Sequence, residues 1–136
     1  KLEKQLCFPL YVCSKEIIKR YKPFLEQINL TYTQYIIMMV MWKEKEISFR
    51  DLTKKVFLES NTLTPVLKKL EAKKFITRKK IAGNDKNIVI SITKKGIALK
   101  EKAKLVPIQL VKCLEIDKDD GNALKEILYR MMQTFY

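Results

Sequence analysis

The apolar residues of the N-terminal segment recur at intervals of three and four, a spacing typical of an amphipathic helix. They are Leu6, Leu10, Cys13, Ile17 and Tyr21. Because the residue before a proline disfavours the helical conformation, the sequence predicts that this helix ends before Pro23. Its apolar stripe needs a partner surface.

The segment from Tyr32 to Trp42 is apolar almost all round, as expected of a helix buried at the centre of a domain. Thr31 and Gln34 have the spacing of a capping box, in which the first residue and the residue three positions later satisfy each other's backbone N–H groups. The sequence therefore predicts a central buried helix here.

Two shorter helices are predicted next. Ser48 and Asp51 repeat the capping pattern more weakly, before an apolar face of Phe49, Leu52 and Val56. The inward face of the following helix is predicted to consist of Leu63, Val66, Leu67 and Leu70. Capping rules favour Thr64 as its cap with Pro65 as its first residue, but a start at Ser60 also fits.

Two strands follow, at residues 75–80 and 87–93, and the second alternates isoleucine with smaller or polar residues. Between them, Ala82, Gly83, Asn84 and Asp85 are typical turn residues. Two short helices followed by a basic hairpin is the order of a winged helix-turn-helix, whose second helix enters the major groove of DNA.

The C-terminal region is predicted to be helical again. A helix from about Lys94 to Leu105 meets Pro107 and continues, with a kink, through Leu110 and Leu114. Asp117 or Asp119 caps a last helix, whose stripe is Leu124, Ile127, Leu128, Met131 and Phe135. Because a chain of this size leaves little apolar surface for this stripe to cover, we expect the terminal helices to pair across a dimer axis.

These elements predict a mainly α fold with a small β-hairpin wing. At 136 residues and 47% hydrophobic, the chain can bury one core, and we read residues 1–136 as a single domain. Residues 31–93 would form the winged helix-turn-helix, and residues 1–30 and 94–136 the dimerisation helices.

The charge distribution indicates a polyanionic partner. The chain has 28 Lys and Arg against 15 Asp and Glu, a net charge of +13. Residues 60–104 alone hold 13 Lys and Arg against 3 acids, which is +10 of that total. A solvated lysine-rich face is the alternative, but this window is where we expect nucleic acid to bind.

Other chemistry is largely excluded by composition. The absence of His removes the usual general base and the commonest zinc ligand, and three scattered Gly cannot form a phosphate-binding loop, so we expect no enzyme, no metal and no cofactor. The longest apolar run, residues 36–42, is too short for a membrane helix. Three cysteines without a visible secretory signal favour reduced thiols and a cytoplasmic location.

Several segments, taken together, resemble the peroxide-sensing OhrR and SarZ/MgrA branch of the MarR family. They are QLCFPLY, YKPFLEQINLTYTQY, LESNTLTPVLKKLEAKKFITRK and ISITKKG. The match runs from residue 2 to about 100, and the C-terminal third matches only as helices. The resemblance implies a homodimeric repressor that binds duplex operator DNA and releases it when an N-terminal cysteine is oxidised by organic hydroperoxide or a related oxidant.

That cysteine would be Cys7. In the family two tyrosine hydroxyls of the partner subunit lie near the thiolate, and here they would be Tyr21 and Tyr32. Cys7 and Tyr21 are 14 residues apart, about 21 Å along one helix, so they cannot touch within one chain. Tyr11, one turn after Cys7, could also contribute. Cys113 lies where two-cysteine members carry a resolving thiol, so an intersubunit disulfide with Cys7 is possible.

The thiolate is the form that attacks a peroxide, so the pKa of a sensing cysteine must be low. Pro9 departs from the family pattern, and by removing a helical hydrogen bond it would delay the helix start until after Cys7, placing Cys7 at a helix N-terminus. Cys13 lies in the apolar stripe and is read as an inert packing residue.

On the DNA side, we expect the predicted recognition helix to read bases with Asn61, Thr62 and Thr64. Phosphate contacts are expected from the neighbouring positions Ser60, Lys68, Lys69, Arg78, Lys79 and Lys80. Relatives carry Asp-Glu-Arg in the wing, with the Arg in the minor groove, whereas this chain has Asn84, Asp85 and Lys86. Because Lys is a poor substitute for Arg there, minor-groove selectivity should be weaker.

Alternatives remain open at this point. A MarR-type repressor controlled by a small aromatic ligand, or by none, would leave Cys7 merely buried. A winged-helix module for protein or structured RNA would show no preference among DNA duplexes. An enzymatic peroxidase would consume peroxide catalytically rather than stoichiometrically, yet nothing in the sequence recycles the thiol.

Overall fold

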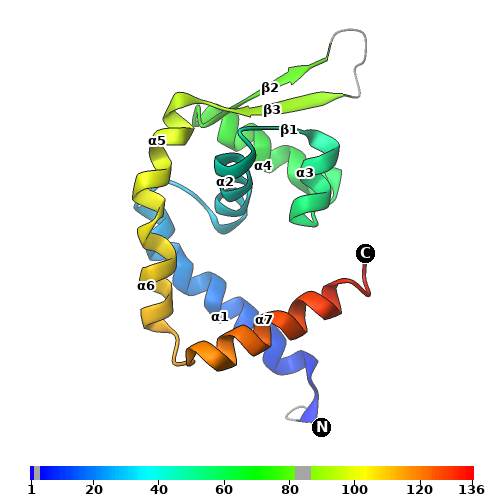
Figure 1. Cartoon of the computed structure of the whole chain (residues 1–136), viewed down its shortest axis with the longest axis vertical. Helices are drawn as coiled ribbons and strands as arrows, with labels where there is room; N and C mark the ends of the chain where they lie inside the picture. Colours follow the sequence, from blue (N-terminus) through cyan, green and yellow to red (C-terminus); the bar gives the residue numbers. More distant parts are fainter. Residues whose placement is uncertain (2–3, 82–86) are drawn as a thin grey trace.

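The computed structural model describes residues 1, 4–81 and 87–136. Its helices are α1 (Cys7–Glu26), α2 (Tyr32–Glu44), α3 (Phe49–Val56), α4 (Ser60–Ala72), α5 (Lys94–Ala103), α6 (Leu105–Cys113) and α7 (Lys118–Met132), and its strands are β1 (Glu46–Ser48), β2 (Ile76–Lys80) and β3 (Ile88–Ile92). In Figure 1 the segment from α2 to β3 forms one lobe, while α1, α6 and α7 lie away from the sheet and α5 runs between the two regions.

Helix α1 does not end before Pro23, as the sequence predicted, but continues to Glu26 with Pro23 inside it. A proline removes one backbone hydrogen bond, a loss that tertiary packing can outweigh. The last turn of α1 carries Leu25, which is almost completely buried in the core. Burial of this side chain accounts for a helix that the local rule would have stopped.

Helix α2 is the centre of the core, as predicted. The capping box is present: Gln34 N–H donates to Thr31 Oγ1 over 3.4 Å, and Thr31 N–H donates to Gln34 Oε1 over 3.1 Å. At its other end Trp42 Nε1 donates to the carbonyl of Gly96 over 2.8 Å. A Cβ at Gly96 would lie 2.3 Å from the Phe75 carbonyl oxygen, so only glycine permits this close approach of α5 to the core.

Within the described residues the sheet has three strands in the order β1-β3-β2, of which β1 was not predicted. The predicted hairpin strands pair antiparallel, with Arg78 opposite Ile90, and β1 adds to the other edge of β3, with Ile47 opposite Ile90. A three-residue strand is too short to show an alternating pattern. The predicted turn at residues 82–85 lies outside the described residues.

Helices α3 and α4 confirm the predicted helix-turn-helix. Ser48 caps α3 by accepting from Asp51 N–H. Helix α4 starts at Ser60, the second of the two starts considered, and contains Pro65. Pro65 lies in the second turn, so its missing N–H leaves only the Asn61 carbonyl without its helical donor. With the β2–β3 hairpin after them, these helices complete the winged helix-turn-helix.

The C-terminal helices differ from one another in burial. The predicted break near Pro107 falls at Lys104, because Pro107 cannot donate to the carbonyl four residues before it, and α6 then buries Val106 and Leu110. Asp117, one of two caps considered, caps α7 by accepting from Asp120 N–H. Helix α7 buries no residue, and Leu124 and Ile127 of its predicted stripe are about half exposed.

Candidate nucleic-acid interface and thiol sites

Helix α4 presents one apolar and one polar face. Leu63, Leu67 and Leu70 are completely buried. On the polar side Ser60, Asn61, Thr62, Lys68 and Lys69 are exposed, as the sequence predicted for contacts with bases and phosphates. Thr64 is half-buried, and its hydroxyl donates to the Ser60 carbonyl over 2.8 Å. A base contact by Thr64 would therefore use the acceptor capacity that this hydroxyl retains.

The cations of β2 fall into two kinds. Lys79 and Lys80 are exposed, as expected for phosphate contacts. Arg78 is instead bound to Glu71 of α4, with Nη2 and Nε 2.9 Å and 3.2 Å from Glu71 Oε1. The hydrogen bond from Arg78 holds the pKa of Glu71 below its usual value, so this carboxylate stays ionised. Lys86, the remaining predicted DNA contact, lies outside the described residues.

A polar joint, missed in the sequence, connects the end of α4 with the turn between α1 and α2. Lys73 Nζ donates to the Asn29 carbonyl over 2.8 Å and to Gln34 Oε1 over 2.7 Å. Asn29 has a left-handed backbone (φ 59°), and Gln34 is buried. Burial, assisted by the nearby charge of Lys69, lowers the pKa of Lys73. Since these partners lie about forty residues away in sequence, no local signal identifies this lysine among its neighbours.

The three cysteines are free and exposed in the single chain. Cys7 is the first residue of α1, and the preceding Leu6 provides no side-chain cap. Pro9 was expected to delay the helix start until after Cys7, but α1 begins at Cys7 itself. Cys7 nevertheless lies in the first turn of the helix, at its N-terminus, as predicted. Cys113 is the last residue of α6. Cys13 was read as a packing residue, but within one chain it packs against nothing that buries it.

The predicted tyrosines form a cluster between α1 and α2. The ring centroids of Tyr21 and Tyr32 are 4.9 Å apart, and Tyr35, which the sequence reading did not single out, lies 6.0 Å from Tyr21. Burial, with Tyr32 and Tyr35 nearby, raises the pKa of Tyr21 to about 12. Burial also raises the pKa of Tyr32, assisted by Tyr129 of α7. These hydroxyls therefore stay protonated and can donate hydrogen bonds at neutral pH.

Tyr11 stands apart from this cluster. Its ring is mostly exposed, and Lys15 Nζ lies 5.7 Å from the ring centroid. Cys7 and Tyr21 occupy the same regular helix, 14 residues apart, which is about 21 Å along the axis. The structure of one chain therefore brings Tyr21 and Tyr32 together but does not bring Cys7 to them.

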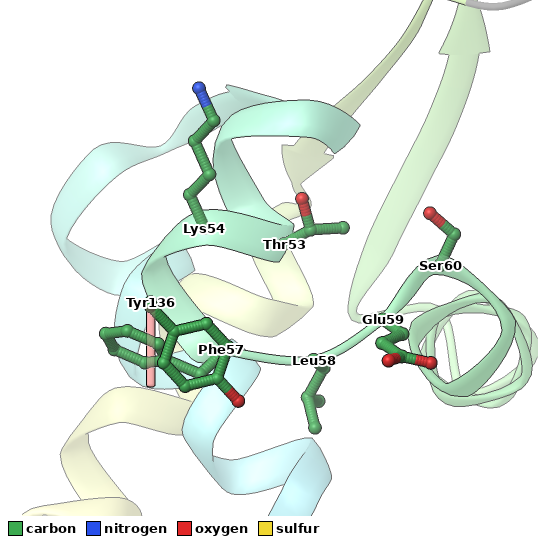
Figure 2. A pocket seen from close by; sticks show the side chains of 7 residues that line it. All are labelled: Thr53, Lys54, Phe57, Leu58, Glu59, Ser60 and Tyr136. Atoms are coloured by element: carbon green, nitrogen blue, oxygen red, sulfur yellow. The ribbon is translucent and has the colours of Figure 1, made fainter. Parts of the chain in front are cut away.

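A hollow of about 460 Å³ lies beside the turn between α3 and α4 (Figure 2). Its lining consists of Thr53, Lys54, Phe57, Leu58, Glu59, Ser60 and Tyr136. Phe57 adopts a left-handed backbone (φ 56°), and its ring lies 4.9 Å from that of Tyr136. The C-terminal segment thus touches the helix-turn-helix of its own chain, a contact that sequence patterns do not indicate.

The described residues contain neither a membrane-spanning helix nor a candidate metal site. None of their helices is long and apolar enough to cross a membrane. Nor do these parts of the chain contain a group of three or more cysteine or acidic side chains arranged to hold a metal ion.

Comparison with known proteins agrees with this geometry. Residues 19–103 match the family described as transcriptional regulator SarA/Rot. The chain is 38% identical over 136 residues, 100% of its length, to the organic hydroperoxide resistance transcriptional regulator of Bacillus subtilis, and covers 92% of that protein. It is 39% identical over 135 residues to the transcriptional regulator SarZ of Staphylococcus saprophyticus, covering 99% of this chain and 92% of the relative.

Solved structures show the same fold. The structure of reduced AbfR bound to DNA superposes with a TM-score of 0.84 at 28% identity, covering 98% of this chain and 92% of the other. The MepR–DNA complex of Staphylococcus aureus superposes with a TM-score of 0.81 at 21% identity, covering 96% and 98%. The named relatives regulate transcription and are not enzymes, which agrees with the prediction of no enzyme. This chain is therefore a DNA-binding transcriptional regulator of the MarR family, in the branch that holds the organic hydroperoxide resistance regulator and SarZ.

Proposed function

We propose that this chain is a redox-sensing repressor that binds duplex operator DNA as a homodimer and releases it when Cys7 is oxidised by an organic hydroperoxide. The observation that carries the proposal is the position of Cys7, exposed at the N-terminus of α1. At this position the Cys7 side chain is open to solvent, so an oxidant can reach its sulfur. The names of the relatives, among them an organic hydroperoxide resistance regulator, support the same oxidant class.

The chemistry needs only the thiolate and the hydroperoxide. The Cys7 sulfur attacks the outer peroxide oxygen, an S–O bond forms as the O–O bond breaks, and the alcohol leaves after taking a proton. Cysteine becomes sulfenic acid, and the hydroperoxide is reduced to alcohol. If Cys113 then attacks the sulfenic sulfur, a disulfide forms and water leaves.

The dimer supplies what one chain lacks. Two α1 helices packed antiparallel would place Cys7 of one subunit near Tyr21 and Tyr32 of the other, where protonated hydroxyls can donate to the thiolate. In the proposed dimer, residues 1–30 and 94–136 form the dimerisation region and residues 31–93 bind DNA. The exposed apolar stripe of α7 supports this division.

On the DNA, the proposed base contacts come from Asn61, Thr62 and Thr64. Ser60, Lys68, Lys69, Lys79 and Lys80 are proposed to contact phosphates. Oxidation would favour a dimer whose two recognition helices no longer match successive major grooves, about 34 Å apart. Affinity would then fall without any change in the DNA-binding surface itself.

The test is binding of the purified chain to the DNA upstream of its own gene, reduced and after stoichiometric cumene hydroperoxide. We expect tight binding by the reduced protein, lost on oxidation in the wild type and retained in Cys7→Ser. Cys13→Ser is the matched control, since it removes an exposed thiol from the same helix and should respond like wild type. Cys113→Ser shows whether a disulfide is required. Wild-type binding that ignores the oxidant would overturn the proposal.

A second candidate is control by a small aromatic acid. A hollow of about 290 Å³ adjoins the tyrosine cluster and is lined by Ile18, Lys19, Lys22, Leu25, Glu26, Leu30, Thr31 and Tyr32. Its lysines could pair with a carboxylate while its apolar side chains contact a ring. This candidate predicts that an aromatic carboxylate such as salicylate releases DNA from wild type and Cys7→Ser alike, and that Lys22→Met abolishes the response.

A further inference from the structure

One ion pair joins the recognition helix α4 to the wing strand β2. The Glu71 carboxylate accepts three hydrogen bonds from a single residue: Arg78 Nε and Nη2 donate to Oε1, and the Arg78 backbone N–H donates to Oε2 over 3.1 Å. Because both the side chain and the backbone N–H of Arg78 donate to Glu71, these bonds fix the orientation of the guanidinium and of the strand. Glu71 is one of only three acids among residues 60–104, the window that also holds 13 Lys and Arg.

The backbone bond is explained by the sheet topology. Strand β2 lies at the edge of the sheet, paired with β3 on one side only. An edge strand leaves alternate N–H groups without a strand partner. The Glu71 carboxylate takes the place of that partner at Arg78, so the helix itself holds the outer edge of the wing.

The same contacts restrict what Arg78 can do on DNA. Its side chain is 22% exposed and already bonded, whereas Lys79 and Lys80 on the same strand are exposed. The Glu71 carboxylate stays ionised beside the guanidinium, so the charge of Arg78 is already balanced within the protein and adds little to the neutralisation of a phosphate. This differs from the role that the sequence predicted for Arg78.

We propose that Glu71 and Arg78 are positioning residues for DNA binding: their pair holds the wing strand at a set position against the recognition helix, so that both meet the duplex together. Arg78 acts through this contact and does not neutralise a phosphate. The inference rests on DNA binding by this chain and is independent of the oxidant response.

The experiment measures affinity, salt dependence and stability together. The reduced protein is titrated by fluorescence anisotropy against a labelled duplex of about 30 base pairs, roughly three helical turns, taken from its own upstream DNA. The titration is repeated at several KCl concentrations. The variants are Glu71→Gln, Arg78→Met, the double variant, and Lys80→Met as the matched cation on the same strand. Thermal unfolding by circular dichroism confirms that each variant is folded at the temperature of the titration.

We expect Glu71→Gln and Arg78→Met each to weaken binding about fivefold, the equivalent of about 1 kcal/mol for a partly exposed pair. The double variant should be no weaker than either single variant, because the two residues act as one unit. The slope of log affinity against log salt should stay at its wild-type value in Arg78→Met. In Lys80→Met the magnitude of this slope should fall by about 0.9 for each phosphate that the protein no longer neutralises.

Three results would overturn the proposal. If Glu71→Gln binds as tightly as wild type or more tightly, removal of a negative charge beside DNA outweighs any positioning. If Arg78→Met flattens the salt slope as Lys80→Met does, Arg78 is a phosphate contact. If both variants melt earlier yet bind with wild-type affinity, the pair only stabilises the fold. If the wild type binds no duplex at all, the conclusion that this chain binds DNA is itself wrong, a result distinct from the three above.

Discussion

Helices α4 and α7 are both amphipathic, but only α4 has its apolar face covered. Leu67 of α4 is completely buried, whereas Ile127 of α7 is 50% exposed. Sequence spacing indicates which face of a helix is apolar, and it does so equally well for both. What covers that face depends on the rest of the fold for α4 and, in our proposal, on a second subunit for α7. Mutations in α4 and in α7 test whether their apolar faces are covered in these two different ways.

The largest effect is expected in α4. Leu67→Ala should lower the free energy of unfolding by about 2 to 5 kcal/mol, since it deletes buried methyl groups and leaves a cavity. Chemical denaturation monitored by circular dichroism measures the change. The exposed neighbour Lys68 provides the control, and Lys68→Ala should change stability by less than about 0.5 kcal/mol. Equal losses in both variants would mean that the two faces of α4 are not as different as their burial indicates.

A smaller effect, of another kind, is expected in α7. Ile127→Lys should raise the dissociation constant of the dimer by about 10- to 100-fold, since it places a charge in an apolar interface. Sedimentation equilibrium measures this constant, and Lys125→Glu on the same helix tests whether any charge change has the same effect. An unchanged monomer–dimer equilibrium in Ile127→Lys would show that the stripe of α7 is not part of the interface.

A smaller loss of stability is expected where the end of α4 contacts the turn between α1 and α2. Lys73→Met removes two hydrogen bonds and leaves the buried Gln34 side chain without its ammonium partner, so stability should fall by about 1 to 2 kcal/mol. The exposed Lys69 is the control, and Lys69→Met should have almost no effect on unfolding. If Lys73→Met is as stable as wild type, the contact with Asn29 contributes little to holding α1 against the DNA-binding half.

The last effect is absent at neutral pH, because it is a pH dependence confined to alkaline solution. The pKa of Tyr21 rises from 10.0 to about 12 in the folded chain, so the folded state holds this proton more tightly than the unfolded state does. The stability from this group is therefore complete below about pH 10 and is lost as pH rises toward 12. Tyr21→Phe should remove this part of the dependence, and absorbance titration of tyrosinate checks the pKa directly. Loss of the Tyr21 proton near pH 10 would contradict the buried cluster.

Local features were read correctly from the sequence because their causes are local. The caps at Thr31, Ser48 and Asp117 depend on residues three positions apart. The order of two helices and a hairpin follows from periodicity alone, and the family resemblance led to the cysteine and the tyrosines. Where a local rule failed, at Pro23, burial of the following Leu25 outweighed it.

Contacts between distant segments were not readable. Strand β1 exists only because β3 pairs with it, and Tyr35 joins Tyr21 only because α1 packs on α2. Strand alternation places Arg78 and Lys79 on opposite faces, but nothing in the order of residues shows that Arg78 is bound to Glu71 while Lys79 is exposed.

The sequence by itself determined most of the helices, the two hairpin strands, the caps at Thr31, Ser48 and Asp117, the apolar faces and the basic region, since these follow from neighbours along one helix or strand. The tertiary structure alone decided which charges are available to DNA, which tyrosines meet and which apolar faces remain uncovered. These depend on side chains brought together from remote parts of the chain, whose pairing no spacing rule encodes.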